Sequence, residues 1–298
     1  MARILVTGIA VHDIVFRLAA IPTGQGKNYA DLRREVVGGI AANAAIAIQR
    51  LGGQAVLATC LGEDMAGRVI ADALAKEGVG LEAVTWSSTA QTGLSAILVD
   101  AAGERLLVNH TDPALFSPAT DSIDGLGDEF DAVLVDTRWL AGSLASLRLA
   151  KARNLPGVMD FDSVPATGAL ELLAAASHVV FGEAALLKLS GAGDLVAGLR
   201  WARQHTAAFL AVTAGERGVT WLAGDAVRQQ AAFKVEAVDT LAAGDVFHGA
   251  FTLAVAEGQA IGDAMVFAAA VAALKCLRFG GGTGTPTREE VAKFLGQQ

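Results

Sequence analysis

Short runs that are apolar at every position alternate with helix-forming stretches along almost the whole chain, and this alternation most constrains the fold. A strand with one exposed face alternates apolar and polar residues, whereas a strand covered on both faces is apolar throughout. The runs are Ile4–Val6, Ala55–Thr59, Ala132–Val135, Val158–Asp160, His178–Phe181 and Phe209–Thr213. The helix-forming stretches are 40–51, 64–77, 142–153, 167–176, 193–205, 244–257, 259–277 and 287–296. This order predicts a doubly wound α/β sandwich around a parallel sheet.

Two segments interrupt the alternation, because their strand-like runs are not separated by helices. They are residues 11–36 and 92–110. In the second segment, Thr92–Asp100 and Glu104–His110 flank Ala101-Ala102-Gly103, which predicts a hairpin. We interpret the two segments as a small β-sheet lid. No stretch has linker composition, so we expect residues 1–298 to form a single domain that includes this lid.

The charge and hydropathy of the chain exclude several classes of function. Its net charge is −8, whereas proteins that bind nucleic acid present basic surfaces. Its longest apolar stretch, Ala264 to Leu274, is shorter than the ~20 residues that span a bilayer. The two cysteines have no metal-like spacing, and we expect no signal peptide. We therefore expect a cytoplasmic protein without nucleic-acid or membrane partners, in which an anionic ligand would need a local Lys or Arg pocket.

The segment Val238–Phe251 carries the first candidate chemistry. In it, the small residues Ala242-Ala243-Gly244 lead directly into a helix that begins near Asp245. Small residues let a ligand approach the backbone, and the free N–H groups at a helix start bind phosphate. A carboxylate at this place suits a base that accepts the proton of a hydroxyl attacking the phosphate. From these residues alone, an ordinary acidic residue that stabilises the helix dipole remains the alternative for Asp245.

A second segment, Gly38-Gly39-Ile40-Ala41-Ala42-Asn43, also leads from a turn into a helix. The glycine pair permits a tight turn. Asn43 lies one turn into the helix, where its amide could hydrogen-bond a sugar hydroxyl. A plain helix start with a solvated Asn43 is the alternative.

Together the two segments resemble the paired signatures of the ribokinase, or pfkB, family of carbohydrate kinases, and the resemblance extends almost to the end of the chain. It implies an ATP-dependent kinase with a doubly wound α/β domain and a β lid over the sugar. It also implies that Asp245 is the catalytic base and that the amides of Ala242, Ala243 and Gly244 form the anion hole. The matching residues are Gly39, Asn43, Gly52, Gly62, Asp239, Thr240, Ala242–Asp245, Gly249 and Ala250.

The resemblance also implies the binding residues for sugar, nucleotide and metal. Many members carry an Asn-x-x-Glu motif that organises magnesium, and Gly182-Glu183-Ala184-Ala185 stands in its place here. We expect ATP and Mg²⁺, with the metal held by phosphate oxygens and water. Glu183 is a side chain that could assist, and no protein ligand is assigned. A monovalent cation is left open. The implied sugar-binding residues are Asp13, Gly38, Gly39 and Asn43, and the implied nucleotide-binding residues are Glu183, Thr213, Gly215, Gly218, Ala273 and Cys276.

Three polar residues could form a pocket for an anionic group on the sugar. Lys27 lies in the first lid segment, Asn109 ends the second, and Arg138 stands at the carboxyl end of a strand. For Lys27 and Asn109 alone, a solvated surface role is the more favoured alternative. Within the family, the chain most resembles kinases of 6-deoxy-6-sulfofructose, which phosphorylate its 1-hydroxyl in sulfoquinovose breakdown. That resemblance implies that two cations and an amide hold the sulfonate. It is carried by Lys27, Val108-Asn109, Asp136–Trp139, Ala232–Val235, Gly244–Ala250 and Ala272–Cys276.

Other functions remain as alternatives. Within the family, the acceptor could be another ketose, a sugar phosphate or a keto-deoxy sugar acid. A non-catalytic sugar-binding regulator on the same scaffold is less favoured, because it would not need Asp245. A Rossmann dehydrogenase is excluded, because Gly8–His12 lacks the Gly-x-Gly-x-x-Gly turn. Lid sheets of the family often pair between subunits, so we expect a homodimer through the lid.

Overall fold

The apolar runs form strands whose successive residues enter two different hydrophobic cores. A computed structural model describes residues 1–101, 104–116, 120–127 and 129–297. In β1 (Arg3–Thr7), Ile4 and Val6 pack into one core and Leu5 into the other. The side chains of β8 (Ala132–Val135) and β10 (His178–Gly182) are likewise divided between the two cores. Consecutive side chains of a strand point to opposite faces, so a strand that is apolar throughout has to be covered on both.

These strands belong to a large sheet in the order β13-β12-β11-β10-β9-β8-β1-β4-β5. Seven consecutive strands of this sheet run parallel, from β5 at one edge through β4, β1, β8, β9 and β10 to β11. β12 and β13 are antiparallel to their neighbours. β4 and β8 lie on opposite sides of β1, and sheets of this kind bind ligands at the carboxyl ends of the strands beside such a reversal. The remaining strands are β4 (Gln54–Gly62), β5 (Val84–Ser87), β9 (Gly157–Phe161), β11 (Phe209–Thr213), β12 (Val219–Ala223) and β13 (Ala226–Gln230).

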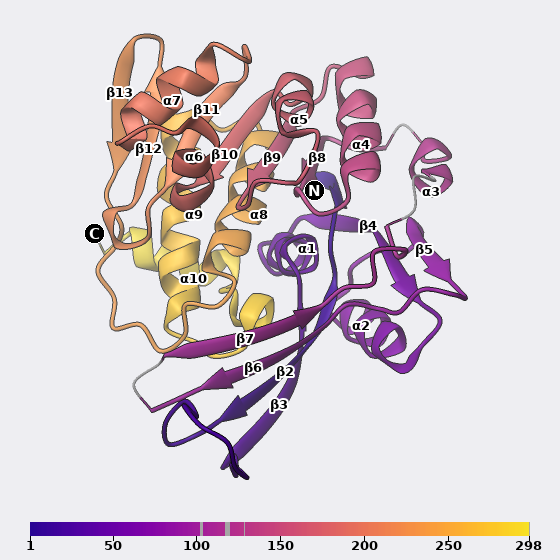
Figure 1. Cartoon of the computed structure of the whole chain (residues 1–298). Coiled ribbons are helices and arrows are strands. Elements are labelled where there is room, and N and C mark those ends of the chain that lie inside the picture. The colour runs from indigo at the N-terminus through magenta and orange to yellow at the C-terminus, as the bar shows by residue number, and fades with distance from the viewer. Residues whose placement is uncertain (102–103, 117–119, 128, 298) are drawn as a thin grey trace.

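Helices cover both faces of the large sheet (Figure 1). The helices on one face are α1 (Ile40–Arg50), α2 (Met65–Lys76), α8 (Ala243–Ala256), α9 (Ile261–Cys276) and α10 (Arg288–Leu295). Those on the other are α3 (Asp121–Asp124), α4 (Leu140–Ala152), α5 (Ala169–Ala175), α6 (Glu183–Ser190) and α7 (Leu195–Arg203). The structure thus confirms the predicted doubly wound α/β fold. Among the described residues, no helix has both the length and the apolar character needed to span a bilayer.

Several elements are not evident from the sequence pattern, and each for a physical reason. β13 lies at the edge of the sheet and exposes most of its residues, so it lacks the apolar run of a central strand. β12 pairs antiparallel to β11 and carries Thr220 at a partly exposed position. α3 and α6 are too short for a helical repeat of apolar residues to stand out.

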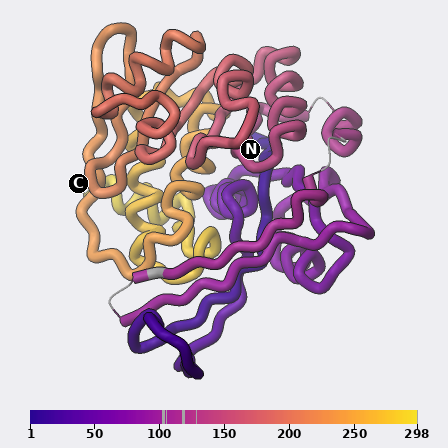
Figure 2. Tube along the Cα trace, in the orientation of Figure 1, coloured from indigo at the N-terminus to yellow at the C-terminus, as the bar shows by residue number. Residues whose placement is uncertain are grey.

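The two strand-like segments form a second, four-stranded sheet in the order β3-β2-β6-β7, which projects from the helical layers beside α1 and α2 (Figures 1 and 2). Its strands are β2 (Val11–Arg17), β3 (Leu32–Gly38), β6 (Leu94–Val99) and β7 (Arg105–His110). β6 and β7 form the predicted hairpin, with Leu94 opposite His110; Ala102 and Gly103 at its tip lie outside the described residues. The small sheet is therefore present, and its action as a lid stays a prediction.

Candidate active site

Acidic side chains gather at the carboxyl ends of neighbouring parallel strands. Asp136 follows β8, Asp160 lies in β9, and Asp162 comes directly after β9. Asp136 is buried and accepts hydrogen bonds from the backbone N–H groups of Ile9 (2.7 Å) and Arg138 (2.8 Å). Burial raises the pKa of Asp136 to about 7, although the two N–H groups oppose this shift. Asp136 thus ties the loop after β1 to the loop after β8.

The turn predicted to bind phosphate opens α8 at this edge of the sheet. Ala242 has φ 62°, in the left-handed region that favours glycine, and α8 begins at the next residue. The Asp239 carboxylate accepts a hydrogen bond from the N–H of Leu241 at 2.9 Å, which fixes the residues leading into the turn. A Cβ placed on Gly244 would meet no described atom within 4 Å, so a ligand can approach the helix start. The N–H of Ala243 donates to the Thr240 carbonyl oxygen at 3.3 Å, and N–H groups that stay free at a helix start bind phosphate well.

Asp245 stands in the first turn of α8, partly exposed beside this opening. Its Oδ2 accepts a hydrogen bond from Nδ2 of Asn43 at 2.8 Å, which orients the carboxylate. Burial and the neighbouring Asp160 raise the pKa of Asp245 to about 7, whereas the Asn43 bond and His248 act in the opposite direction. A carboxylate with this pKa can take up a proton near neutral pH.

Asn43 joins the candidate base Asp245 to a second loop. It is buried in α1, and while its Nδ2 donates to Asp245, its Oδ1 accepts a hydrogen bond from the N–H of Gly282 at 2.9 Å. Gly282 belongs to the 3-10 turn η2 (Gly281–Gly284), which follows α9. The two signature segments therefore meet in space, and Asn43 contacts the candidate base directly. Its predicted contact with a sugar hydroxyl stays a prediction.

The Gly38-Gly39 turn lies against Asp13. A Cβ on Gly38 would overlap the Asp13 carboxylate, and one on Gly39 would collide with the backbone of Ile9. Gly39 also has φ 94°, which favours glycine. Asp13 is buried in β2; burial raises its pKa, and a hydrogen bond from Ser95 opposes the shift. The glycine pair thus lets the candidate sugar-binding residue Asp13 approach the start of α1.

A buried ion pair beneath Asp245 was missed by the sequence reasoning. His248 lies one turn further along α8, and its Nδ1 is 2.9 Å from Oδ2 of Asp160 and 2.7 Å from the Gly244 carbonyl oxygen. Its Nε2 is 3.2 Å from the Val180 carbonyl oxygen. A carbonyl oxygen only accepts, so these contacts favour a ring with hydrogen on both nitrogens, which is an imidazolium. Burial opposes this charge, but Asp160 and the Gly244 carbonyl raise the pKa of His248 to about 9.

The candidate nucleotide-binding residues lie at the ends of β10 and β11 and along α9. The Thr213 hydroxyl donates to the Phe181 carbonyl at 3.2 Å, and Gly215 and Gly218 both have positive φ in the loop that follows. Glu183 opens α6 and forms an ion pair with Arg217 from the same loop. Further along, Ala273 is buried and Cys276 partly buried near the end of α9. Their contacts with a nucleotide stay a prediction.

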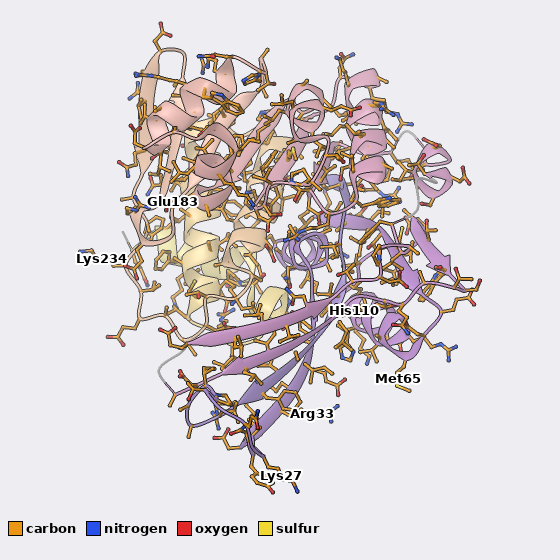
Figure 3. The ribbon with its side chains drawn as sticks, viewed as in Figure 1. Lys27, Arg33, Met65, His110, Glu183 and Lys234 are labelled. Carbon is orange, nitrogen blue, oxygen red and sulfur yellow. The ribbon has the colours of Figure 1, made fainter. Side chains whose placement is uncertain are left out.

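The three candidate residues for an anionic group are not brought together within this one chain. Arg138 is partly exposed, and its Nη2 lies 3.4 Å from Oδ2 of Asp162. In the small sheet, Asn109 lies opposite Ser95 of β6, and Ser95 lies opposite Asp13 of β2. Asn109 and Asp13 therefore share one face of this sheet. Lys27 lies at the far end of the small sheet and points away from the helical layers (Figure 3). A pocket built from all three residues stays a prediction.

Comparison with known proteins agrees with this arrangement. A model of the pfkB family of carbohydrate kinases matches residues 1–288. A ribokinase from Haemophilus influenzae is 28% identical over 283 residues, which cover 91% of this chain and 89% of that protein. Fructokinase-1 from Zea mays is 28% identical over 311 residues, which cover 92% and 94%. A crystal structure of a candidate ribokinase from Agrobacterium tumefaciens aligns with a TM-score of 0.94 at 39% identity, covering 99% of this chain and 98% of that chain.

Proposed function

Because this chain belongs to the pfkB family of carbohydrate kinases, we propose that it transfers the γ-phosphoryl group of ATP to the 1-hydroxyl of 6-deoxy-6-sulfofructose. The hydroxyl oxygen attacks the γ-phosphorus, the bond to the β–γ bridging oxygen breaks, and ADP leaves. Asp245 accepts the proton of the hydroxyl. The N–H groups of Ala242, Ala243 and Gly244 stabilise the charge on the transferring group.

The hydrogen bond between Asn43 and Asp245 at the open start of α8 is the observation that carries this chemistry. It fixes one carboxylate oxygen, and the other remains available to an incoming hydroxyl. A base is most effective when its pKa lies near the working pH, and the pKa of Asp245 is raised to about 7. A protein that only bound sugar or nucleotide would need neither the orientation nor this pKa.

The residues around the site fit a metal that is bound mainly through the nucleotide. Mg²⁺ commonly keeps several waters and binds substrate phosphates with few protein ligands. Among the described residues, no group of three His, Cys, Asp or Glu side chains is arranged to hold a metal, and Glu183 is already paired with Arg217. When bound, the metal would neutralise phosphate charge during transfer.

Arg138 supports an acceptor that carries an anionic group. It is held at the carboxyl end of β8 by Asp162, in a protein whose net charge is −8. A sulfonate that reached Arg138 would replace or share its contact with Asp162, and Asn109 stands on the face of the small sheet that carries Asp13. The relatives include ribokinases and fructokinases. A kinase of another ketose, a sugar phosphate or a keto-deoxy sugar acid is therefore the alternative.

An acceptor screen tests this proposal. ATP consumption is measured with 6-deoxy-6-sulfofructose, fructose 1-phosphate, fructose 6-phosphate, tagatose 6-phosphate, fructose, ribose and ketodeoxygluconate. We expect the highest kcat/KM with the sulfonated sugar. A higher value with fructose or ribose would overturn the proposed acceptor and leave the kinase chemistry in place.

Replacing Arg138 by Ala should lower kcat/KM for the sulfonated sugar by about 10- to 100-fold, because one charge-assisted contact to the sulfonate is lost. The loss for fructose should be less than about threefold, since fructose has no anion to pair. The matched control is Arg148→Ala, which removes an exposed arginine of α4 that pairs with Glu171 of α5. Equal losses on both sugars would mean that Arg138 only supports the fold.

We further propose that two copies associate through their small sheets. β7 is an edge strand of that sheet, and Leu106, Leu107 and Val108 expose 44%, 45% and 63% of their surfaces. An exposed apolar edge strand is normally covered by a partner. Association would also give Lys27 a neighbouring site to reach, because it points away from its own chain's helical layers. Sedimentation velocity should show a dimer, and Val108→Lys should shift it toward monomer; a monomer at all concentrations would refute this proposal.

A further inference from the structure

Lys275, near the end of α9, is a charged side chain with no exposed surface. Buried lysines are rare, because removing an ammonium from water is costly unless other groups pair with it. Here Nζ lies 2.9 Å from the backbone carbonyl oxygen of Asp239 and 3.3 Å from Oδ2 of the same residue. The ammonium therefore binds both the main chain and the side chain of Asp239.

Asp239 in turn fixes the anion-hole turn. Its Oδ1 accepts the N–H of Leu241 at 2.9 Å, and Leu241 directly precedes Ala242, whose left-handed backbone opens the turn. The backbone N–H of Asp239 donates to the Cys276 carbonyl, which follows Lys275 in α9. The lysine and its own helix thus hold the residues that lead into the candidate anion hole.

A second branch runs from the same ammonium to the candidate base. Oδ2 of Asp239 also accepts the N–H of Gly280 at 3.1 Å, at the start of the loop that contains η2. Two residues further on, the N–H of Gly282 donates to Oδ1 of Asn43, and Nδ2 of Asn43 donates to Asp245. The anion-hole turn and the base therefore depend on the same buried charge.

We propose that the ammonium of Lys275 is a built-in cation that positions the anion hole and Asp245, so that the enzyme needs no free monovalent cation for this purpose. Lys275 does not touch the reacting atoms, and it acts through Asp239. A tethered cation stays beside the Asp239 carboxylate and helps to hold its two backbone contacts in place whatever salt surrounds the protein. The inference rests on the proposed function only where the effect of Lys275 is measured as turnover of the sugar.

The test compares the wild type with three variants in ammonium chloride, potassium chloride and tetramethylammonium chloride at equal ionic strength. Wild-type turnover should be the same in all three salts. Lys275→Ala opens a space beside Asp239 that ammonium or potassium can enter and tetramethylammonium cannot. In tetramethylammonium its kcat should fall on the order of 10²-fold, as expected when catalytic groups shift by about 1 Å. Ammonium should raise the kcat of Lys275→Ala at least about tenfold above its value in tetramethylammonium, whereas its KM for ATP should change little.

Lys275→Met is the matched variant, because it fills the space with an apolar chain and leaves no room for an ion. We expect its kcat to fall by a similar factor and not to recover in any salt. Lys293→Ala, at an exposed position on α10, controls for the loss of a lysine elsewhere and should match the wild type.

Thermal unfolding gives a readout that does not depend on turnover. An ion that binds only the folded state raises the melting temperature. Ammonium should therefore stabilise Lys275→Ala relative to tetramethylammonium, and should not do so for the wild type or for Lys275→Met. If no sugar is turned over, the proposed function fails and this measurement still decides the role of Lys275.

Three results would overturn the inference. One is a wild-type enzyme whose turnover requires potassium or ammonium, and this arm needs no variant to fold. Another is a Lys275→Ala enzyme as active in tetramethylammonium as the wild type. The third is a folded Lys275→Ala enzyme that ammonium neither reactivates nor stabilises, which would make Lys275 a structural residue only.

Discussion

Replacing Asp245 by Asn should lower kcat by about 10²- to 10⁴-fold, the range that a general base contributes. Asn keeps the size of the side chain and can still meet Asn43, but it cannot accept a proton. Binding of ATP, measured by calorimetry, should change less than about threefold, because the proposed role of Asp245 is toward the acceptor and not the nucleotide. A variant with turnover near that of the wild type would remove Asp245 as the base.

Two controls separate this loss from a general effect. Asp263→Asn changes an exposed carboxylate in the first turn of α9 and should leave kcat unchanged. The wild-type kcat/KM should rise about tenfold per pH unit below about pH 7 and level off above it, because the base must be ionised and its pKa is raised to about 7. A flat profile across this range would contradict the assignment.

Replacing His248 by Leu should lower the free energy of unfolding by about 3–5 kcal/mol, the usual cost of removing one partner of a buried ion pair. None of the described residues gives Asp160 another hydrogen bond, so its carboxylate would stay buried without a counter-charge. Urea denaturation measures the change. His205→Leu, at an exposed position, should change stability by less than about 0.5 kcal/mol.

The double variant His248→Leu/Asp160→Leu distinguishes a lost charge pair from lost packing. It removes both charges and should be more stable than His248→Leu alone. The pH dependence has a definite sign, because the pKa of His248 is raised from 6.5 to about 9 on folding. The stabilisation from His248 is complete below about pH 6.5 and is lost as the pH rises through about 9. If the free energy of unfolding of His248→Leu is less than about 1 kcal/mol below that of the wild type, the charge-pair argument is contradicted.

Central strands and helices could be predicted from the sequence because their burial leaves a pattern. Ile4–Val6 is apolar throughout, since both its faces are covered. The edge strand β13 has no such pattern, because solvent covers it in place of helices. The two signature segments predicted that Asp245 and Asn43 share a site, and the structure adds that Asn43 hydrogen-bonds the carboxylate itself.

The charges beneath the site could not be predicted from local residues. His248 looks like any polar residue after Phe247, and its partner Asp160 comes from a strand far away in the sequence. Lys275 left a stronger signal, because it interrupts an otherwise apolar stretch at the end of α9. A lone lysine in such a stretch indicates a buried cation that must be paired. Which residue pairs with Lys275 cannot be predicted from this stretch, because only the fold brings Asp239 beside it.

The hydrogen bonds of Asn43 also affect the order in which the protein can fold during its synthesis. One joins residues 202 positions apart and the other residues 239 positions apart. Contacts between such distant residues form late, because a long chain segment must first be closed into a loop. On the ribosome, the N-terminal half can fold its strands while Asp245 and Gly282 are still unsynthesised. A nascent or truncated chain that ends before η2 would therefore contain all strands of the small sheet but lack the Gly282 contact that holds Asn43.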